Sequence, residues 1–131
     1  MEYLNVIAAA VGAFAFGAVW YIVMSKPWVK AAGIPVDANG RPQGNGSAMP
    51  FVIGLVAMLV VAGTMRHMFA FAGIDTLAEG VTTGAGVGAF FISAWVGMNY
   101  GFSMRPLALW VIDTVNAVVG CAIMGAILTL F

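Results

Sequence analysis

The chain has 131 residues, of which 63% are hydrophobic and only 8% are charged, and its mean hydropathy is +1.02. A soluble domain carries charge on about a quarter of its residues, so this composition excludes a water-soluble globular protein and predicts a membrane protein. Basic and acidic residues are balanced at 5 each, which excludes a positive field that would attract nucleic acid. The length fits a single domain over residues 1–131.

The first apolar segment, residues 4–24, is long enough to cross a bilayer as one helix. No basic residue precedes it, and the apolar run is longer than the core of a signal peptide, so we expect a retained span. It ends in Trp20 and Tyr21, and aromatic residues at the end of a span are typical of the membrane interface. Small residues at every fourth position favour close helix packing: Ala9, Ala13 and Gly17.

Residues 25–49 form a polar stretch that we expect to be a cytoplasmic loop. Its first part predicts a short interfacial helix from Ser25 to Gly33, with Pro27 in the first turn and the glycine as its stop. The remainder has no apolar periodicity, which predicts an irregular surface loop. Turn sequences fill it: Asn39-Gly40, Arg41-Pro42 and Gly44-Asn45-Gly46.

The second span is predicted over residues 50–73 and begins with a proline. Arg66 and His67 lie within its last two turns, where a long basic side chain can reach the lipid headgroups. We expect His67 to be an interfacial histidine bonded to a carbonyl or to lipid. A pH-sensing role for His67 has only the intrinsic pKa of the imidazole in its favour.

The third span is predicted over residues 76–100, and Thr76 and Glu79 at its start have the spacing of a capping box. Glycine disfavours helices, so glycines repeated at every fourth position predict helix backbones in close contact. We expect one such stripe and a second, rotated one. The first contains Gly80, Gly84 and Gly88, and the second contains Ser93, Gly97 and Gly101. Packing inside the bundle is sufficient to explain both, and an oligomer seam is the alternative.

The last span, residues 106–131, contains Asp113 and Asn116, which lie three residues apart and therefore on one helix face. Polar groups inside a membrane are costly, so this pair must face protein or water. One interpretation is a polar clasp, with Asp113 hydrogen-bonded to Asn116, Thr114 or another helix. The other is a proton or cation site on a transport path. Gly125 continues a small-residue stripe in the same span.

Together the segments predict an all-α membrane protein, a four-transmembrane-helix antiparallel bundle with a short interfacial helix and a loop after the first span. Short turns favour antiparallel neighbours, so the second to fourth spans should pack up and down. The positive-inside rule places the basic loops in the cytoplasm and both termini in the periplasm of a bacterial inner membrane. The residues concerned are Lys26, Lys30, Arg41 and Arg105.

Short motifs typical of one protein family are spread over nearly the whole chain outside residues 34–49. They are Phe16-Gly17, Trp20-Tyr21, Lys26-Pro27-Trp28, Gly33, Asn99-Tyr100, Arg105-Pro106-Leu107, Ile112 with its polar neighbour, and Gly125-Ala126-Ile127-Leu128. With these motifs the chain resembles the bacterial membrane family known as domain of unknown function 1761. The resemblance implies a small multi-span membrane protein and assigns no activity. The family usually has asparagine after the isoleucine, where this chain has Asp113.

No catalytic or metal-binding pattern stands out. One His and one Cys give no metal-ligand spacing. A catalytic triad of Ser93 or Ser103 with His67 and Asp113 is not expected, because these residues fall at different depths.

We therefore predict a non-enzymatic accessory or structural subunit that packs against itself or a larger respiratory or photosynthetic complex. The alternative is a small oligomeric transporter or channel with Asp113 and Asn116 on the path. No cofactor is indicated, although a bound lipid, quinone or pigment needs no motif. The expected partners are membrane lipids and membrane protein subunits.

Overall fold

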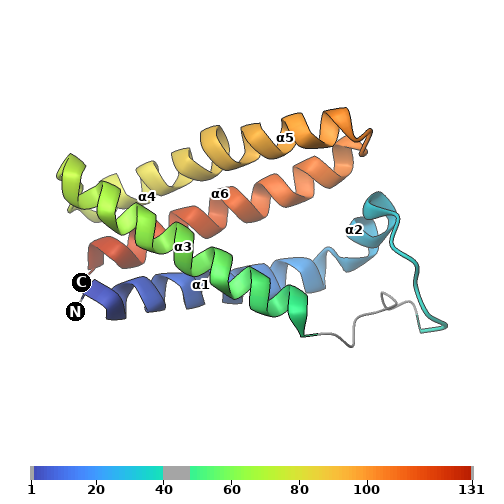
Figure 1. The fold of residues 1–131 in the computed structure, drawn as a ribbon, viewed down its shortest axis with the longest axis horizontal. Helices are drawn as coiled ribbons and strands as arrows, with labels where there is room; N and C mark the ends of the chain where they lie inside the picture. Colours follow the sequence, from blue (N-terminus) through green and yellow to red (C-terminus); the bar gives the residue numbers. More distant parts are fainter. Residues whose placement is uncertain (1, 40–47, 131) are drawn as a thin grey trace.

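The computed structural model describes residues 2–39 and 48–130 and is all-α (Figure 1). Its elements are α1 (Glu2–Val23), α2 (Ser25–Ala32), α3 (Met49–Ala72), α4 (Leu77–Gly86), η1 (Val87–Ile92), α5 (Ser93–Phe102) and α6 (Leu107–Leu130). Four stretches are long and apolar enough to cross a membrane, which confirms the predicted fold class. They are Tyr3–Val23, Met49–Ala72, Leu77–Phe102 and Leu107–Leu130.

Two helix ends are formed by local chemistry that the sequence predicted. Gly33 ends α2 in the left-handed conformation at φ 70°, and its N–H donates to Val29 O at 3.0 Å. At the start of α4, Glu79 N–H donates to Thr76 Oγ1 at 3.2 Å, and Thr76 N–H donates to a Glu79 carboxylate oxygen at 3.4 Å. The short helix and the capping box are therefore confirmed. The turn sequences predicted for residues 40–47 lie outside the described residues.

The third span is interrupted by η1, a π-helical turn that joins α4 to α5 without a break. Ser93 N–H donates to Gly88 O, five residues earlier, and both residues are buried. The π turn contains one more residue than an α turn, so the small-residue stripe of α4 continues into α5 on the same side. The prediction of a second, rotated stripe is therefore wrong, because it assumed a regular α-helix throughout.

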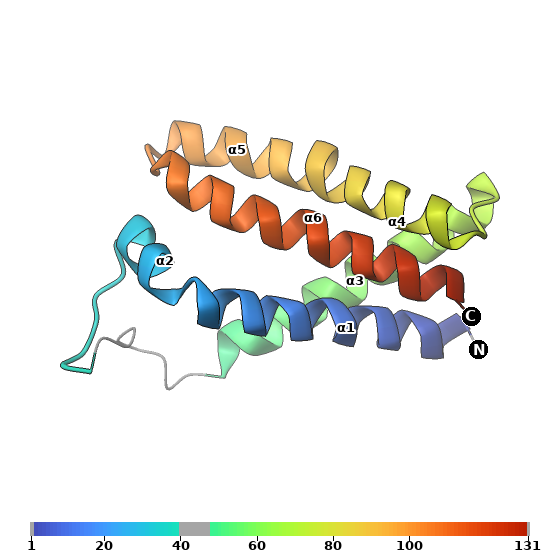
Figure 2. The same cartoon turned by 180° about the vertical axis from the view of Figure 1, so that it is seen from behind.

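Helix α6 occupies the centre of the arrangement (Figures 1 and 2). The third span packs along one side of α6, and α1 packs along its other side. Helix α3 crosses α1 obliquely and has extensive contacts with α1 and not with α4. The two termini lie at the same end of the molecule.

The neighbour of the second span differs from the prediction. A short turn joins α3 to α4, yet α3 buries Ala62, Met65 and Phe69 against α1 and α6 instead. Small side chains on α1 let these larger groups approach closely, as expected for membrane helices. The resulting core lies where α1, α3 and α6 meet. It contains Ala9, Ala10, Ala13, Ala62, Met65, Phe69, Cys121, Met124 and Leu128.

Candidate functional site

The carboxyl group of Asp113 is the centre of a hydrogen-bonded cluster, which we call the tyrosine–aspartate clasp. It consists of Tyr21, Tyr100 and Asp113. The Tyr21 hydroxyl donates to Asp113 Oδ1 at 2.5 Å, and the Tyr100 hydroxyl donates to Oδ2 at 2.5 Å. Tyr21 lies near the end of α1, Tyr100 near the end of α5, and Asp113 in the second turn of α6. One side chain therefore joins three helices.

Asn116 adds to this cluster from the next turn of α6. Its side chain lies close to that of Tyr21. Its Oδ1 is buried and has no hydrogen-bond partner among the described residues. A Cβ added at Gly17 would lie 3.2 Å from this oxygen, so the glycine leaves room for the amide between α1 and α6. The structure thus brings both predicted polar residues, Asp113 and Asn116, to one site.

Two indole groups brace the same end of the helices. Trp20 Nε1 donates to Ile112 O at 3.0 Å, which ties α1 to α6 directly beside Asp113. Trp110 Nε1 donates to Ser93 O at 2.8 Å, which ties α6 to the start of α5. Such bonds replace the interactions with water that the indoles lose in an apolar environment.

The predicted helix-packing glycines line the contact between the third span and α6. Gly80, Gly84 and Gly88 face the backbone of Gly125, Cys121 and Ala117, and a Cβ at any of the three would collide with a carbonyl oxygen. Gly97 faces Trp110 instead, whose Nε1 would lie 2.8 Å from an added Cβ. Close backbone approach of this kind is how membrane helices gain van der Waals contact.

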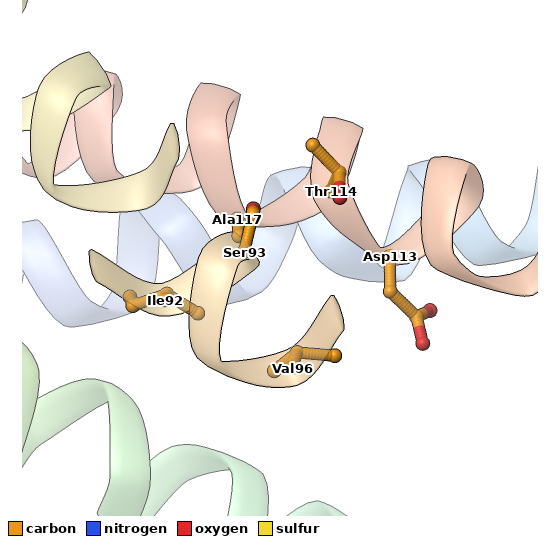
Figure 3. Close-up of a pocket in the computed structure, with 6 residues that line it drawn as sticks. All are labelled: Ile92, Ser93, Val96, Asp113, Thr114 and Ala117. Carbon is orange, nitrogen blue, oxygen red and sulfur yellow. The ribbon is translucent and has the colours of Figure 1, made fainter. Parts of the chain in front are cut away.

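A small cavity adjoins the clasp between α5 and α6, with a volume of about 20 Å³. Figure 3 shows its walls, with Ile92, Ser93 and Val96 on the third span opposite Asp113, Thr114 and Ala117 on α6. Ser93 is only 2% exposed. The hydroxyl oxygens of Ser93 and Thr114 are buried without a hydrogen-bond partner among the described residues.

A larger groove of about 350 Å³ opens at the end of the same helix pair. Gly97 and Gly101 contribute no side chains to its wall, and one guanidinium N–H of Arg105 donates to Ala32 O at 3.2 Å. Its lining residues are Gly97, Tyr100, Gly101, Arg105, Pro106, Leu107 and Trp110.

The remaining predicted polar residues, Arg66 and His67, lie in the last turns of α3. His67 is exposed and its ring meets Phe71 edge-on, with the ring centroids 5.0 Å apart. This end of α3 lies near the two termini, whereas Asp113 lies near the opposite end of the molecule. The structure does not bring Arg66 or His67 to the clasp.

Tyr21 and Tyr100 were not predicted as partners of Asp113, because Tyr21 was assigned to the membrane interface and Tyr100 was noted only as part of a family motif. Both close a span at the end where the last span begins, so their hydroxyls have the same depth as Asp113. A tyrosine carries a donor that a phenylalanine lacks. Comparing the membrane depth of such donors with that of the Asp113 carboxyl group could have identified both tyrosines from the sequence.

These features define a small α-helical membrane protein with four candidate spans, three of them joined by hydrogen bonds to an aspartate. The chain belongs to the family described as Protein of unknown function (DUF1761), whose model matches residues 4–129. The resemblance seen in the sequence is thereby confirmed. No curated protein and no solved structure matches the chain.

Proposed function

We propose that this protein is a non-enzymatic accessory or structural subunit of the bacterial inner membrane, packing against a larger membrane complex or against itself. The observation that carries the proposal is the occupation of both Asp113 oxygens by hydroxyls from two other helices. A carboxyl group held in this way joins helices. A transport site needs ligand positions that open and close.

The exposed apolar surface supports a partner within the membrane. Four aromatic side chains on η1 and α5 are between 65% and 87% exposed, and they project from the side of the third span that α6 does not cover. Lipid can cover such a surface, and so can the helices of another subunit, since membrane helices associate through packing. The residues are Phe90, Phe91, Trp95 and Phe102.

Purification from the native membrane in a mild detergent tests this function. We expect the protein to elute in a stoichiometric complex with other membrane subunits or as a homo-oligomer. Trp95→Ala, on the exposed aromatic surface, should reduce that assembly, whereas Val60→Ala on the exposed face of α3 is the matched control. A monomer that mediates ion flux when reconstituted alone would contradict the proposal.

The alternative function is a small oligomeric transporter or channel with Asp113 and Asn116 on the path. The cavity beside Asp113 favours it, because a cavity next to an intramembrane carboxyl group is a feature of proton and cation paths. Its volume of about 20 Å³ holds a single water. Proteoliposomes loaded with a pH-sensitive dye distinguish the two functions. Proton flux that Asp113→Asn abolishes, with assembly intact, would favour transport.

Membrane lipid is the partner that the larger groove supports. The Arg105 guanidinium has five N–H donors, one of which donates to Ala32 O, and guanidinium groups bind phosphate in bidentate fashion. We infer an anionic phospholipid, with its headgroup at Arg105 and an acyl chain along Gly97 and Gly101. In native mass spectrometry, Arg105→Gln should retain less phosphatidylglycerol than Lys26→Gln, an exposed control on the same side. Equal retention would contradict this assignment.

A further inference from the structure

The cavity beside the clasp contains two buried hydroxyl groups that protein atoms leave unpaired. Ser93 is 2% exposed, and neither its Oγ nor Thr114 Oγ1 has a hydrogen-bond partner among the described residues. Burying a hydroxyl without a partner is unfavourable, because the group loses its hydrogen bonds to water. Two such groups on facing helices therefore indicate that a small polar ligand lies between them.

The size and the lining of the cavity identify that ligand. A volume of about 20 Å³ exceeds the roughly 10–15 Å³ that one water requires and is far too small for an organic molecule. The polar side chains in the wall belong to Ser93, Thr114 and Asp113, and Ile92, Val96 and Ala117 complete it. The Asp113 carboxylate points away from the two hydroxyl groups (Figure 3). Two hydroxyl groups are enough for a buried water, which makes roughly 2–4 hydrogen bonds, and they are too few for a well-coordinated metal cation.

The π-helical turn explains how Ser93 comes to face α6. Its extra residue places Ser93 in line with Gly88, on the side of the third span that packs against α6. Turns of this type often occur at functional sites. Here the turn carries a hydroxyl group into the contact with α6, beside Ala117 (Figure 3).

We propose that this cavity binds a single water molecule that connects Ser93 to Thr114. The water donates a hydrogen to one of the two hydroxyl oxygens and accepts a hydrogen from the other hydroxyl. A polar link between the third span and α6 thereby lies beside the tyrosine–aspartate clasp. This proposal does not depend on the accessory role, because it concerns the isolated chain.

A double-mutant cycle on the purified protein tests the water site. Ser93→Ala and Thr114→Val should each lower the midpoint of thermal unfolding, because each removes a hydrogen bond to the bound water. The double variant should lower it little further than the more harmful single variant, since one change already releases the water. Thr82→Val and Ser103→Ala are matched controls, because these exposed hydroxyls donate only to their own helices, at 2.6 and 2.8 Å.

Two results would overturn the proposal. In a dry cavity the hydroxyls gain nothing from a partner, so the single variants would leave the midpoint unchanged or raise it. In a cation site, replacing Na⁺ by choline would lower the midpoint of the wild type and not of Ser93→Ala. We expect no such dependence on Na⁺. As a second measurement, nuclear Overhauser contacts from a long-lived water to the Ser93 amide should be present in the wild type and lost in the double variant.

Discussion

At the scale of single residues, Asp113 shows what the sequence could and could not predict. The position of an acidic residue three residues before Asn116 predicted a shared polar face, and both side chains do lie in one cluster. The partners from α1 and α5 were not predictable from spacing along α6, because they lie 92 and 13 residues away in the chain. Their identity depends on which helices meet, and composition does not encode that.

Removing either tyrosine hydroxyl should weaken the protein. We expect Tyr21→Phe and Tyr100→Phe each to lower the free energy of unfolding by about 1 kcal/mol, the usual size of a hydrogen bond between membrane helices. Tyr3→Phe is the control, since Tyr3 is 84% exposed. Titration with a denaturing detergent in mixed micelles measures the difference. An effect at Tyr3 equal to those at the other two tyrosines would contradict a specific role of the clasp.

At the scale of helices, the glycine pattern of the third span predicted its close packing, whereas the π turn within that span was not predicted. Spacing of four residues predicted close backbone contact, and Gly80, Gly84 and Gly88 indeed face the backbone of α6. The step of five residues from Gly88 to Ser93 was in the sequence. It indicated two stripes only because a regular helix was assumed, and packing against α6 favours the π turn instead.

Adding one methyl group should have different effects at a glycine inside this helix contact and at one outside it. Gly84→Ala should lower the free energy of unfolding by about 1–3 kcal/mol, because the new Cβ would collide with Cys121 O and force the helices apart. Gly101→Ala meets no atom within 4 Å, so it should leave stability unchanged or raise it by up to about 1 kcal/mol through helix propensity. The same detergent titration compares the two variants. Stabilisation by Gly84→Ala would contradict the close contact.

At the scale of the whole molecule, hydrophobic length alone was enough to predict four spans. The order of the spans in space was not predictable from turn length. A short turn connects α3 to α4, but the small residues of α1 offer α3 the closer fit. The placement of both termini at one end follows from an even number of spans.

The proposed orientation can be tested with reporter cysteines, because the native Cys121 is buried. Lys30 and Asp75 are both exposed and lie at opposite ends of the spans. With both termini in the periplasm, a membrane-impermeant maleimide should label Asp75→Cys in intact cells and Lys30→Cys only after the membrane is permeabilised. The reverse pattern would invert the orientation and leave the fold unchanged.

Helix α3 is anchored unevenly, and this has a consequence for motion. Its buried residues, Ala62, Met65 and Phe69, all lie in its second half, whereas Val52 and Ile53 in the first half are 53% and 60% exposed. Segments with few packed neighbours open at low free energy.

Spin labels at Val52 and at Ala70, each paired with one at Val11, should give a broad distance distribution for the first pair and a narrow one for the second. Equal widths would contradict this expectation. We therefore expect the first half of α3 to swing, while its packed second half, at the end of the molecule where the two termini lie, stays in place.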